Sequence, residues 1–330
     1  MIKKLNLKNG RKKLLMKPDK AVIYFTVSSG TGYGIIISLL TLFFNNEINV
    51  NFNIKLLIAG FSLFLIVSGL LASTIHLGHP ERAWRALSQW KSSWLSREGV
   101  AAIITFFPLN LFFVFWLFTN QTKITYFLLI LSALFSLITV FCTAKIYSSL
   151  KTIPAWNNPF VTLIYILNSL VLGSIFTFTI LFFFDVEINI LSNLIVVLSS
   201  ATLTMKLLYW HSIKKISSSN ISTATGLGTK EKTSFFEGPH TGKNYLTSEM
   251  INKINNSKSL ILRLSFCIFT YVTPAYYFFQ YKHLVVSDYI ISFTLIVISI
   301  IALIGMLIER YLFFIESKHT VSLFYGNKTI

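Results

Sequence analysis

The stretch Phe176-Thr-Phe-Thr-Ile-Leu-Phe-Phe-Phe184 decides the fold class of this chain. A membrane is crossed by α-helices or by closed β-barrels, because both satisfy their backbone hydrogen bonds internally. Barrel strands run for about ten residues and alternate between apolar and polar side chains. This stretch is apolar at both alternating positions, and it belongs to a longer apolar segment at 160–184. The segment therefore predicts a transmembrane helix.

Seven further segments share this character. A helix needs about 20 apolar residues to cross a hydrocarbon core of about 30 Å. The eight predicted spans are 21–44, 54–75, 99–118, 124–146, 160–184, 188–210, 259–279 and 288–315. Only 12% of the 330 residues are charged, about half of the ~25% found in soluble domains. We predict an all-α, polytopic integral membrane protein built as a bundle of eight transmembrane helices.

The N-terminal residues form a basic tail followed by an apolar segment, as signal peptides do. The segment 21–44 is too long for the apolar region of a signal peptide, and no small-residue cleavage site follows it. We expect residues 1–20 to be a basic cytoplasmic tail and residues 21–330 to be the membrane domain. That domain includes one long hydrophilic connection at about 211–258.

Basic residues concentrate in every second connection between the predicted spans. Of the 29 Lys and Arg residues, 26 fall on one side, in the N-terminal tail, the connections at 76–98, around 145–151 and at 206–263, and the C-terminal end. Loops rich in Lys and Arg stay in the cytoplasm, so we predict a multi-pass protein of the bacterial cytoplasmic (inner) membrane with both termini inside. The net charge of +17 thus has a topological explanation, and we expect no nucleic-acid partner.

The densest group of polar residues is His76-Leu-Gly-His79-Pro-Glu-Arg82-Ala-Trp84-Arg85, at the end of the second predicted span. An imidazole there can hydrogen-bond a quinone carbonyl and exchange a proton near neutral pH. The arginines can stabilise a reduced, anionic quinone or bind lipid phosphate. The alternative is that His76 only caps a helix and that the arginines and Trp84 anchor the chain at the interface.

Glu309 and Arg310 lie near the end of the eighth span, and an ionisable group within a span is a functional candidate. Adjacent residues on a helix do not face one another, so we expect each to pair with a different helix. Structural pairing and proton relay both remain open for Glu309.

Cofactor and metal chemistry are limited by the residues available. Cys142 and Cys267 each fall in an apolar segment, so we expect no disulfide between them. An iron–sulfur cluster needs about four thiolates, so any cluster must lie on a partner. A haem held by His76 and His211 is conceivable, although we expect no haem. We predict no metal ligands and no catalytic residues for the partner's substrate.

A set of motifs resembles one family, the membrane anchor subunit (DmsC) of dimethyl sulfoxide reductase-type molybdoenzymes. The motifs are Ser73-Thr-Ile-His-Leu-Gly-His-Pro-Glu-Arg-Ala-Trp84, Ser93-Trp-Leu-Ser-Arg-Glu98, Ala144-Lys-Ile-Tyr147 with Thr152-Ile-Pro-Ala-Trp156, Pro239-His-Thr-Gly242 within the 226–250 connection, and Glu309-Arg-Tyr-Leu-Phe-Phe314 with His319. They follow one another from the second span to the eighth, so the resemblance covers most of the chain.

The resemblance implies a haem-free, eight-helix protein that exchanges electrons between membrane quinone and a four-cluster ferredoxin-like subunit. That partner would relay them to a molybdopterin catalytic subunit. The family's quinol-associated histidine corresponds to His76. We expect a quinone site formed by His76, Arg82, Trp84, Arg85 and Glu309, and a docking surface for the partner formed by Pro239, His240, Asn244 and Tyr245.

The predicted orientation narrows the resemblance. Both the His76 connection and the long connection are predicted inside, which resembles the branch with cytoplasmic catalytic subunits, such as quinone-linked sulfite dehydrogenases. Electrons would then pass from sulfite to quinone rather than from quinol to dimethyl sulfoxide. Two other functions remain as alternatives, a secondary transporter and a haem b-containing quinone-oxidoreductase subunit.

Overall fold

The computed structural model describes residues 19–44, 50–75, 77, 79–119, 122–184, 186, 189–215, 220–226, 256–281 and 288–325. Within these residues all regular structure is helical, and eight helices are long and apolar enough to cross a membrane. They are α1 (Lys20–Phe44), α2 (Phe52–Ile75), α3 (Trp94–Phe118), α4 (Lys123–Ser148), α5 (Pro159–Phe182), α6 (Asn189–Lys215), the continuous helix α9–η2–α10 (Asn256–Gln280) and α11 (Asp288–Ile315). The predicted fold class and the predicted number of spans are confirmed.

The short elements lie between or after the spans. They are η1 (Pro80–Gln89), α7 (Ile221–Thr225) and η4 (Thr320–Tyr325). The first of these confirms that the connection after α2 contains a short helix. Helical backbone also extends into the predicted 211–258 connection, since α6 continues to Lys215 and α9 begins at Asn256. Residues 227–255 of that connection lie outside the described residues.

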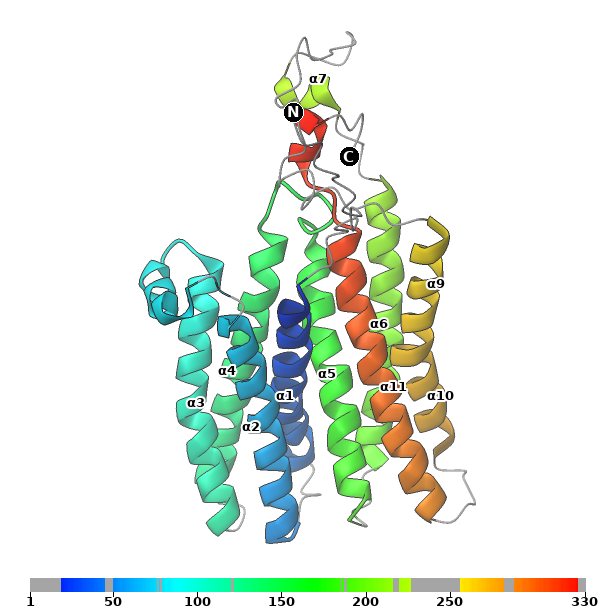
Figure 1. The fold of residues 1–330 in the computed structure, drawn as a ribbon. Coiled ribbons are helices and arrows are strands. Elements are labelled where there is room, and N and C mark those ends of the chain that lie inside the picture. Colours follow the sequence, from blue (N-terminus) through cyan, green and yellow to red (C-terminus); the bar gives the residue numbers. More distant parts are fainter. Residues whose placement is uncertain are drawn as a thin grey trace, which may run out of the picture.

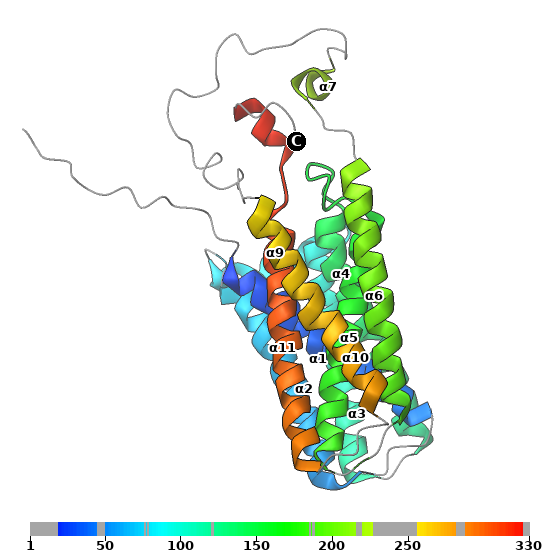
Figure 2. The same cartoon turned by 90° about the vertical axis from the view of Figure 1, so that its right-hand side faces the viewer.

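The spans run roughly parallel to one another and form a single bundle (Figures 1 and 2). The starts of α1, α3, α5 and α9 and the ends of α2, α4, α6 and α11 lie at the same end of the bundle, beside η1 (Figure 1). We call it the η1 end. In Figure 1, α3 lies near one edge of the bundle and α9–α10 at the other.

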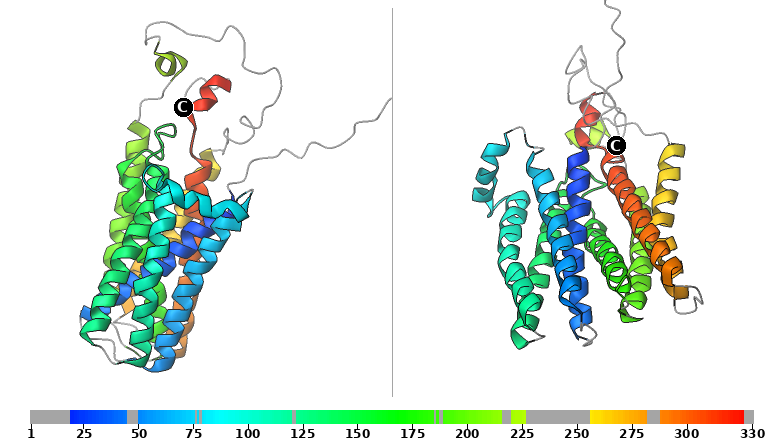
Figure 3. Two further views of the ribbon diagram at one scale, coloured as in Figure 1. Left: turned by 90° about the vertical axis from the view of Figure 1, so that its left-hand side faces the viewer. Right: turned by 60° about the horizontal axis from the view of Figure 1, so that its bottom comes forward.

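Helix α1 is the central element of the bundle, and it packs against α2, α4, α5 and α11 (Figure 3). Its closest crossing is with α5, where Gly34 meets Gly173. A Cβ atom on Gly34 would lie only 1.9 Å from the Ser169 carbonyl oxygen, and one on Gly173 only 2.1 Å from the Gly34 carbonyl carbon. Small residues let helix backbones approach closely in membranes, where van der Waals packing replaces the hydrophobic effect. The glycines of α1 therefore set its position against α5.

The seventh span contains an irregular turn. Residues Ile268–Val272 form a π-helical segment, η2, between α9 and α10. Pro274 follows directly and has no backbone N–H to continue the regular pattern. Insertions of this kind re-aim a side chain within a helix. Here the segment carries Tyr271, which is 1% exposed and points its hydroxyl toward Asn168 on α5, with the hydroxyl oxygen 2.6 Å from Asn168 Oδ1.

Candidate functional site

Three ionisable side chains form a cluster inside the bundle: Lys206 on α6 and Glu309 and Arg310 on α11. Lys206 Nζ donates to Glu309 Oε1, and Arg310 Nε lies 3.2 Å from Glu309 Oε2. The three residues are 4%, 1% and 2% exposed. Two cations thus share one carboxylate, and the cluster carries one unit of excess positive charge when each group is ionised. Charged groups within a span are costly and mark functional positions.

The cluster confirms one sequence expectation and contradicts another. Glu309 does pair with a different helix, through Lys206. Arg310 instead turns back to its neighbour Glu309, so the expectation that it pairs with a separate helix is wrong. The side chains leave α11 in different directions, but the long arginine stem brings its Nε atom back to the carboxylate. Lys206, which the charge count assigns to the sixth connection, lies inside α6. The other basic residues of 206–263 leave the charge bias intact.

Aromatic rings surround the two cations. The Arg310 guanidinium carbon lies 3.5 Å from the centre of the Tyr165 ring, and Lys206 Nζ lies 4.8 Å from the centre of the Tyr209 ring. The ring faces attract these cations electrostatically. Trp156 stacks on Phe313 with a centroid separation of 5.4 Å and donates its indole N–H to the Phe313 carbonyl at 2.9 Å. The structure thus brings two of the motifs together, those at 152–156 and 309–314.

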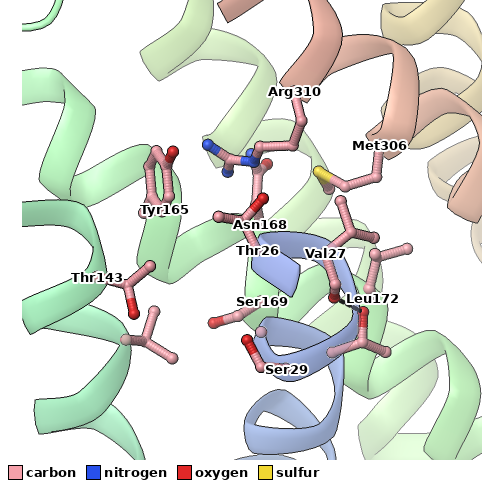
Figure 4. Close-up of a pocket in the computed structure, with 13 residues that line it drawn as sticks. Thr26, Val27, Ser29, Thr143, Tyr165, Asn168, Ser169, Leu172, Met306 and Arg310 are labelled. Atoms are coloured by element: carbon pink, nitrogen blue, oxygen red, sulfur yellow. Dashed lines mark hydrogen bonds between the residues drawn. The ribbon is translucent and has the colours of Figure 1, made fainter. Parts of the chain in front are cut away.

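A polar cavity adjoins Arg310 between α1, α4, α5 and α11 (Figure 4). Asn168 lines it beside Arg310, and its Oδ1 accepts the hydrogen bond from Tyr271 at 2.6 Å. This bond fixes the orientation of the amide and leaves its NH₂ group for the cavity. Among the described residues, Asn168 Nδ2 and Arg310 Nη1 have no hydrogen-bond partner. Two donors are therefore buried at one place without an acceptor.

A second buried carboxylate lies behind the cavity wall. Glu98 on α3 is 4% exposed and accepts a hydrogen bond from the hydroxyl of Thr143 on α4, which lines the cavity. Sequence reasoning did not select Glu98, because the third span was predicted to begin at residue 99. The helix begins at Trp94, capped by Ser93. A carboxylate next to an apolar run, with a cap five residues before it, is the signal that would have placed it inside the helix.

These groups occupy one layer of the bundle. Glu98 follows the start of α3 by four residues, Arg310 precedes the end of α11 by five, and Lys206 precedes the end of α6 by nine. At a rise of 1.5 Å per residue, they lie about 6–13 Å inside the helix ends. All three helix ends are at the η1 end (Figure 1). The ionisable layer therefore lies on the side of the connection that carries His76.

The other predicted quinone-site residues are separate from this layer. Arg82, Trp84 and Arg85 lie on η1 and are exposed, with Trp84 67% exposed. The helix η1 packs mainly against α3 and α2, not against α11. The structure thus does not bring Glu309 together with the three η1 residues. The physical reason is that Glu309 points into the bundle, while η1 lies outside the ends of α2 and α3.

The remaining predicted site residues fall in other parts of the chain. His76 lies outside the described residues, as do the predicted docking residues Pro239, His240, Asn244 and Tyr245. His79, which follows His76 by three residues, is described. It is exposed, and its Nδ1 atom lies 3.0 Å from Glu81 Oε1.

The fold and the layer define a class: a polytopic membrane protein with ionisable groups buried near one end of its bundle. Comparison with known proteins gives the family. A family model for the DMSO reductase anchor subunit (DmsC) matches residues 16–326, and the chain belongs to this family. Members are membrane anchors of molybdoenzyme complexes and associate with catalytic molybdoenzyme subunits.

One characterised relative is similar along nearly its whole length. The chain is 28% identical over 339 aligned residues to a sulfite dehydrogenase subunit of Allochromatium vinosum, and the alignment covers 94% of this chain and 99% of the relative. No solved structure matches the chain. The family match confirms the resemblance on which the sequence expectations rest.

Proposed function

We propose that this chain is the membrane anchor and quinone-interacting subunit of a molybdopterin oxidoreductase of the dimethyl sulfoxide reductase type. Electrons pass between the quinone pool and a four-cluster ferredoxin-like partner, which exchanges them with a molybdopterin catalytic subunit. The similarity to a sulfite dehydrogenase subunit favours sulfite as the substrate and quinone as the electron acceptor. The chain itself carries no catalysis on the sulfur substrate, no haem and no metal.

The observation that carries this proposal is the layer formed by Glu98, Lys206, Glu309 and Arg310. Reduction of a quinone to a quinol takes up two electrons and two protons, so a quinone-reactive membrane subunit needs ionisable groups close to the end at which electrons arrive. The groups of the layer are 1–4% exposed, and a subunit that served only as an anchor would have no need to bury them. Their position at the η1 end favours docking of the iron–sulfur partner at that end.

The proposed quinone-binding residues are His76, Arg82, Trp84, Arg85 and Glu309. Of these, His76 is the proton-exchanging hydrogen-bond partner of a quinone oxygen, because an imidazole titrates near neutral pH. The exposed arginines of η1 attract the anionic reduced forms of the quinone. Glu309 holds the cluster behind them. Pro239, His240, Asn244 and Tyr245 form part of the proposed surface for the iron–sulfur partner.

The test uses the complete complex in membranes. His76→Ala should abolish sulfite-linked reduction of quinone while an artificial acceptor that takes electrons from the catalytic subunits is still reduced at the normal rate. His79→Ala is the matched control, because His79 is a second histidine of the same connection with an exposed side chain. Unchanged quinone turnover in His76→Ala would defeat the assignment of this residue.

The orientation is tested separately. We propose that the protein lies in the bacterial cytoplasmic membrane with both termini and the 211–258 connection in the cytoplasm. Reporter fusions within that connection should be active only for the cytoplasmic reporter. Activity of the reporter that works outside the membrane would reverse the proposed orientation and would point to exported catalytic subunits.

A further inference from the structure

The cavity beside Arg310 has walls of opposite hydrogen-bonding character. On the α5 and α11 side it presents the unpartnered donors of Asn168 and Arg310. On the α1 side it presents Thr26 and Ser29, whose hydroxyl groups already donate to backbone carbonyls of their own helix. Their oxygen atoms can still accept a hydrogen bond. The cavity is therefore complementary to a small molecule that both accepts and donates.

The size of the cavity identifies that molecule as water. Its volume is about 20 Å³, and a cavity of roughly 10–15 Å³ on this scale holds one water molecule. Buried waters typically satisfy polar groups that the protein leaves without partners. A quinone ring does not fit without rearrangement of the surrounding helices.

The cavity leads to a buried acid. Thr143 lines its wall and donates to Glu98, so a water in the cavity is one hydroxyl group away from this carboxylate. Titratable side chains that interact electrostatically with Glu98 come from α1 and α4, namely Tyr33, Cys142 and Tyr147. From the other side, Arg310 of α11 faces the same cavity. Its guanidinium keeps its proton, so it can hold the water but cannot itself relay a proton.

The cavity is close to the aqueous phase. Thr26 follows the start of α1 by six residues, which is about 9 Å along the helix axis. About three waters, each about 2.8 Å from the next, span that distance. A route along the hydroxyl groups of α1 also avoids Lys206, whose positive charge would oppose the passage of a proton.

We propose that the cavity is the water-filled proton inlet to Glu98. The water is held by Arg310 and Asn168 and gives a proton to the Thr143 oxygen as the Thr143 hydroxyl proton passes to the Glu98 carboxylate. The water regains a proton from the aqueous phase at the η1 end. The sequence runs in reverse when Glu98 releases a proton. The use of these protons in quinone chemistry rests on the proposed function, but the inlet itself does not.

The test follows Glu98 directly in the purified complex without added quinone. Infrared spectra recorded after transfer from H₂O to D₂O, across the pH range in which the complex is stable, report the protonated Glu98 carboxyl group. Its band is identified by its loss in Glu98→Gln. In the unmodified protein we expect the band to titrate and to exchange rapidly.

Two pairs of variants test the route. Thr143→Val removes the relay hydroxyl and should slow exchange by roughly 10²–10⁴-fold, the usual contribution of a positioned proton-transfer group, whereas Thr143→Ser should retain fast exchange. Thr139→Val is the control, because its hydroxyl is also buried on α4 but pairs with Thr105 at 3.0 Å. Gly30→Ala should also slow exchange, because its methyl group would enter the cavity and meet only Ser169, at 3.7 Å. Its control is Gly60→Ala, which meets nothing within 4 Å.

Each outcome decides the proposal. Fast exchange in both Thr143→Val and Gly30→Ala would overturn the inlet and leave the water with a structural role only. A Glu98 band that does not titrate would overturn it as well, because a relay carboxyl group must take up a proton. Because quinone is absent, the result is independent of the His76→Ala experiment. Rapid Glu98 exchange alongside normal quinone turnover in His76→Ala would support the inlet and reject the assignment of His76.

Discussion

Glu309→Gln removes the one carboxylate that Lys206 and Arg310 share. Breaking a buried ion pair costs about 3–5 kcal/mol, because the remaining charge stays desolvated. Both cations here are 4% exposed or less, so we expect the loss to reach the upper end of that range, about 5 kcal/mol. Lys206→Met should cost less, because Glu309 keeps its ion pair with Arg310. We expect about 1.5–3 kcal/mol, the value of one hydrogen bond to a charged group.

The two free cysteines supply the assay. Cys142 and Cys267 are buried, so a maleimide dye that fluoresces on reaction with thiols labels them as the bundle unfolds. Melting curves in a single detergent then rank the variants. Glu81→Gln is the control, since the Glu81–His79 pair is exposed and an exposed pair contributes only about 0–1 kcal/mol. The reasoning is refuted if Glu309→Gln melts no lower than Lys206→Met.

Two further predictions concern packing and pH. Gly34→Ala should destabilise the bundle by about 1–3 kcal/mol or more, because the new Cβ would lie 1.9 Å from a backbone oxygen of α5; equal melting of Gly34→Ala and Gly60→Ala would contradict the close α1–α5 crossing. Burial lowers the pKa of His319 below its usual 6.5, and its Nδ1 accepts a hydrogen bond from the Val321 N–H at 3.0 Å. The unfolded chain therefore binds more protons in this range, so stability is complete above pH 6.5 and falls as the pH decreases through the lowered pKa. His319→Gln should flatten this decline, measured by tryptophan fluorescence, and an unchanged slope would exclude His319 as its source.

Several sequence expectations depended on where a helix begins or ends. The spans were predicted within a few residues, because apolar length alone determines where a helix can cross the bilayer. The errors at two ends were nevertheless decisive for function. A start at residue 99 instead of Trp94 left Glu98 outside the third span, and counting Lys206 as a loop residue hid its place in α6.

Pairing between distant residues was beyond the sequence. Glu309 was selected as a candidate, but nothing in the sequence indicated that its partner is Lys206, 103 residues earlier. The same separation divides Tyr271 from Asn168. The polar cavity and its unpartnered donors depend on such pairs. Four helices that are not consecutive in the sequence supply its walls.

The sequence by itself determined the environment of this protein, the eight spans and the family. Hydrophobic length and the distribution of Lys and Arg are properties of the chain, and the bilayer reads them directly. Only the tertiary structure decided which side of each helix faces its neighbours. The physical reason is that lipid and protein interior are similarly apolar, so the hydrophobic pattern of a span does not distinguish its buried face. The ionisable layer at the η1 end, with Glu98 behind its cavity, therefore became visible only when the helices were packed together.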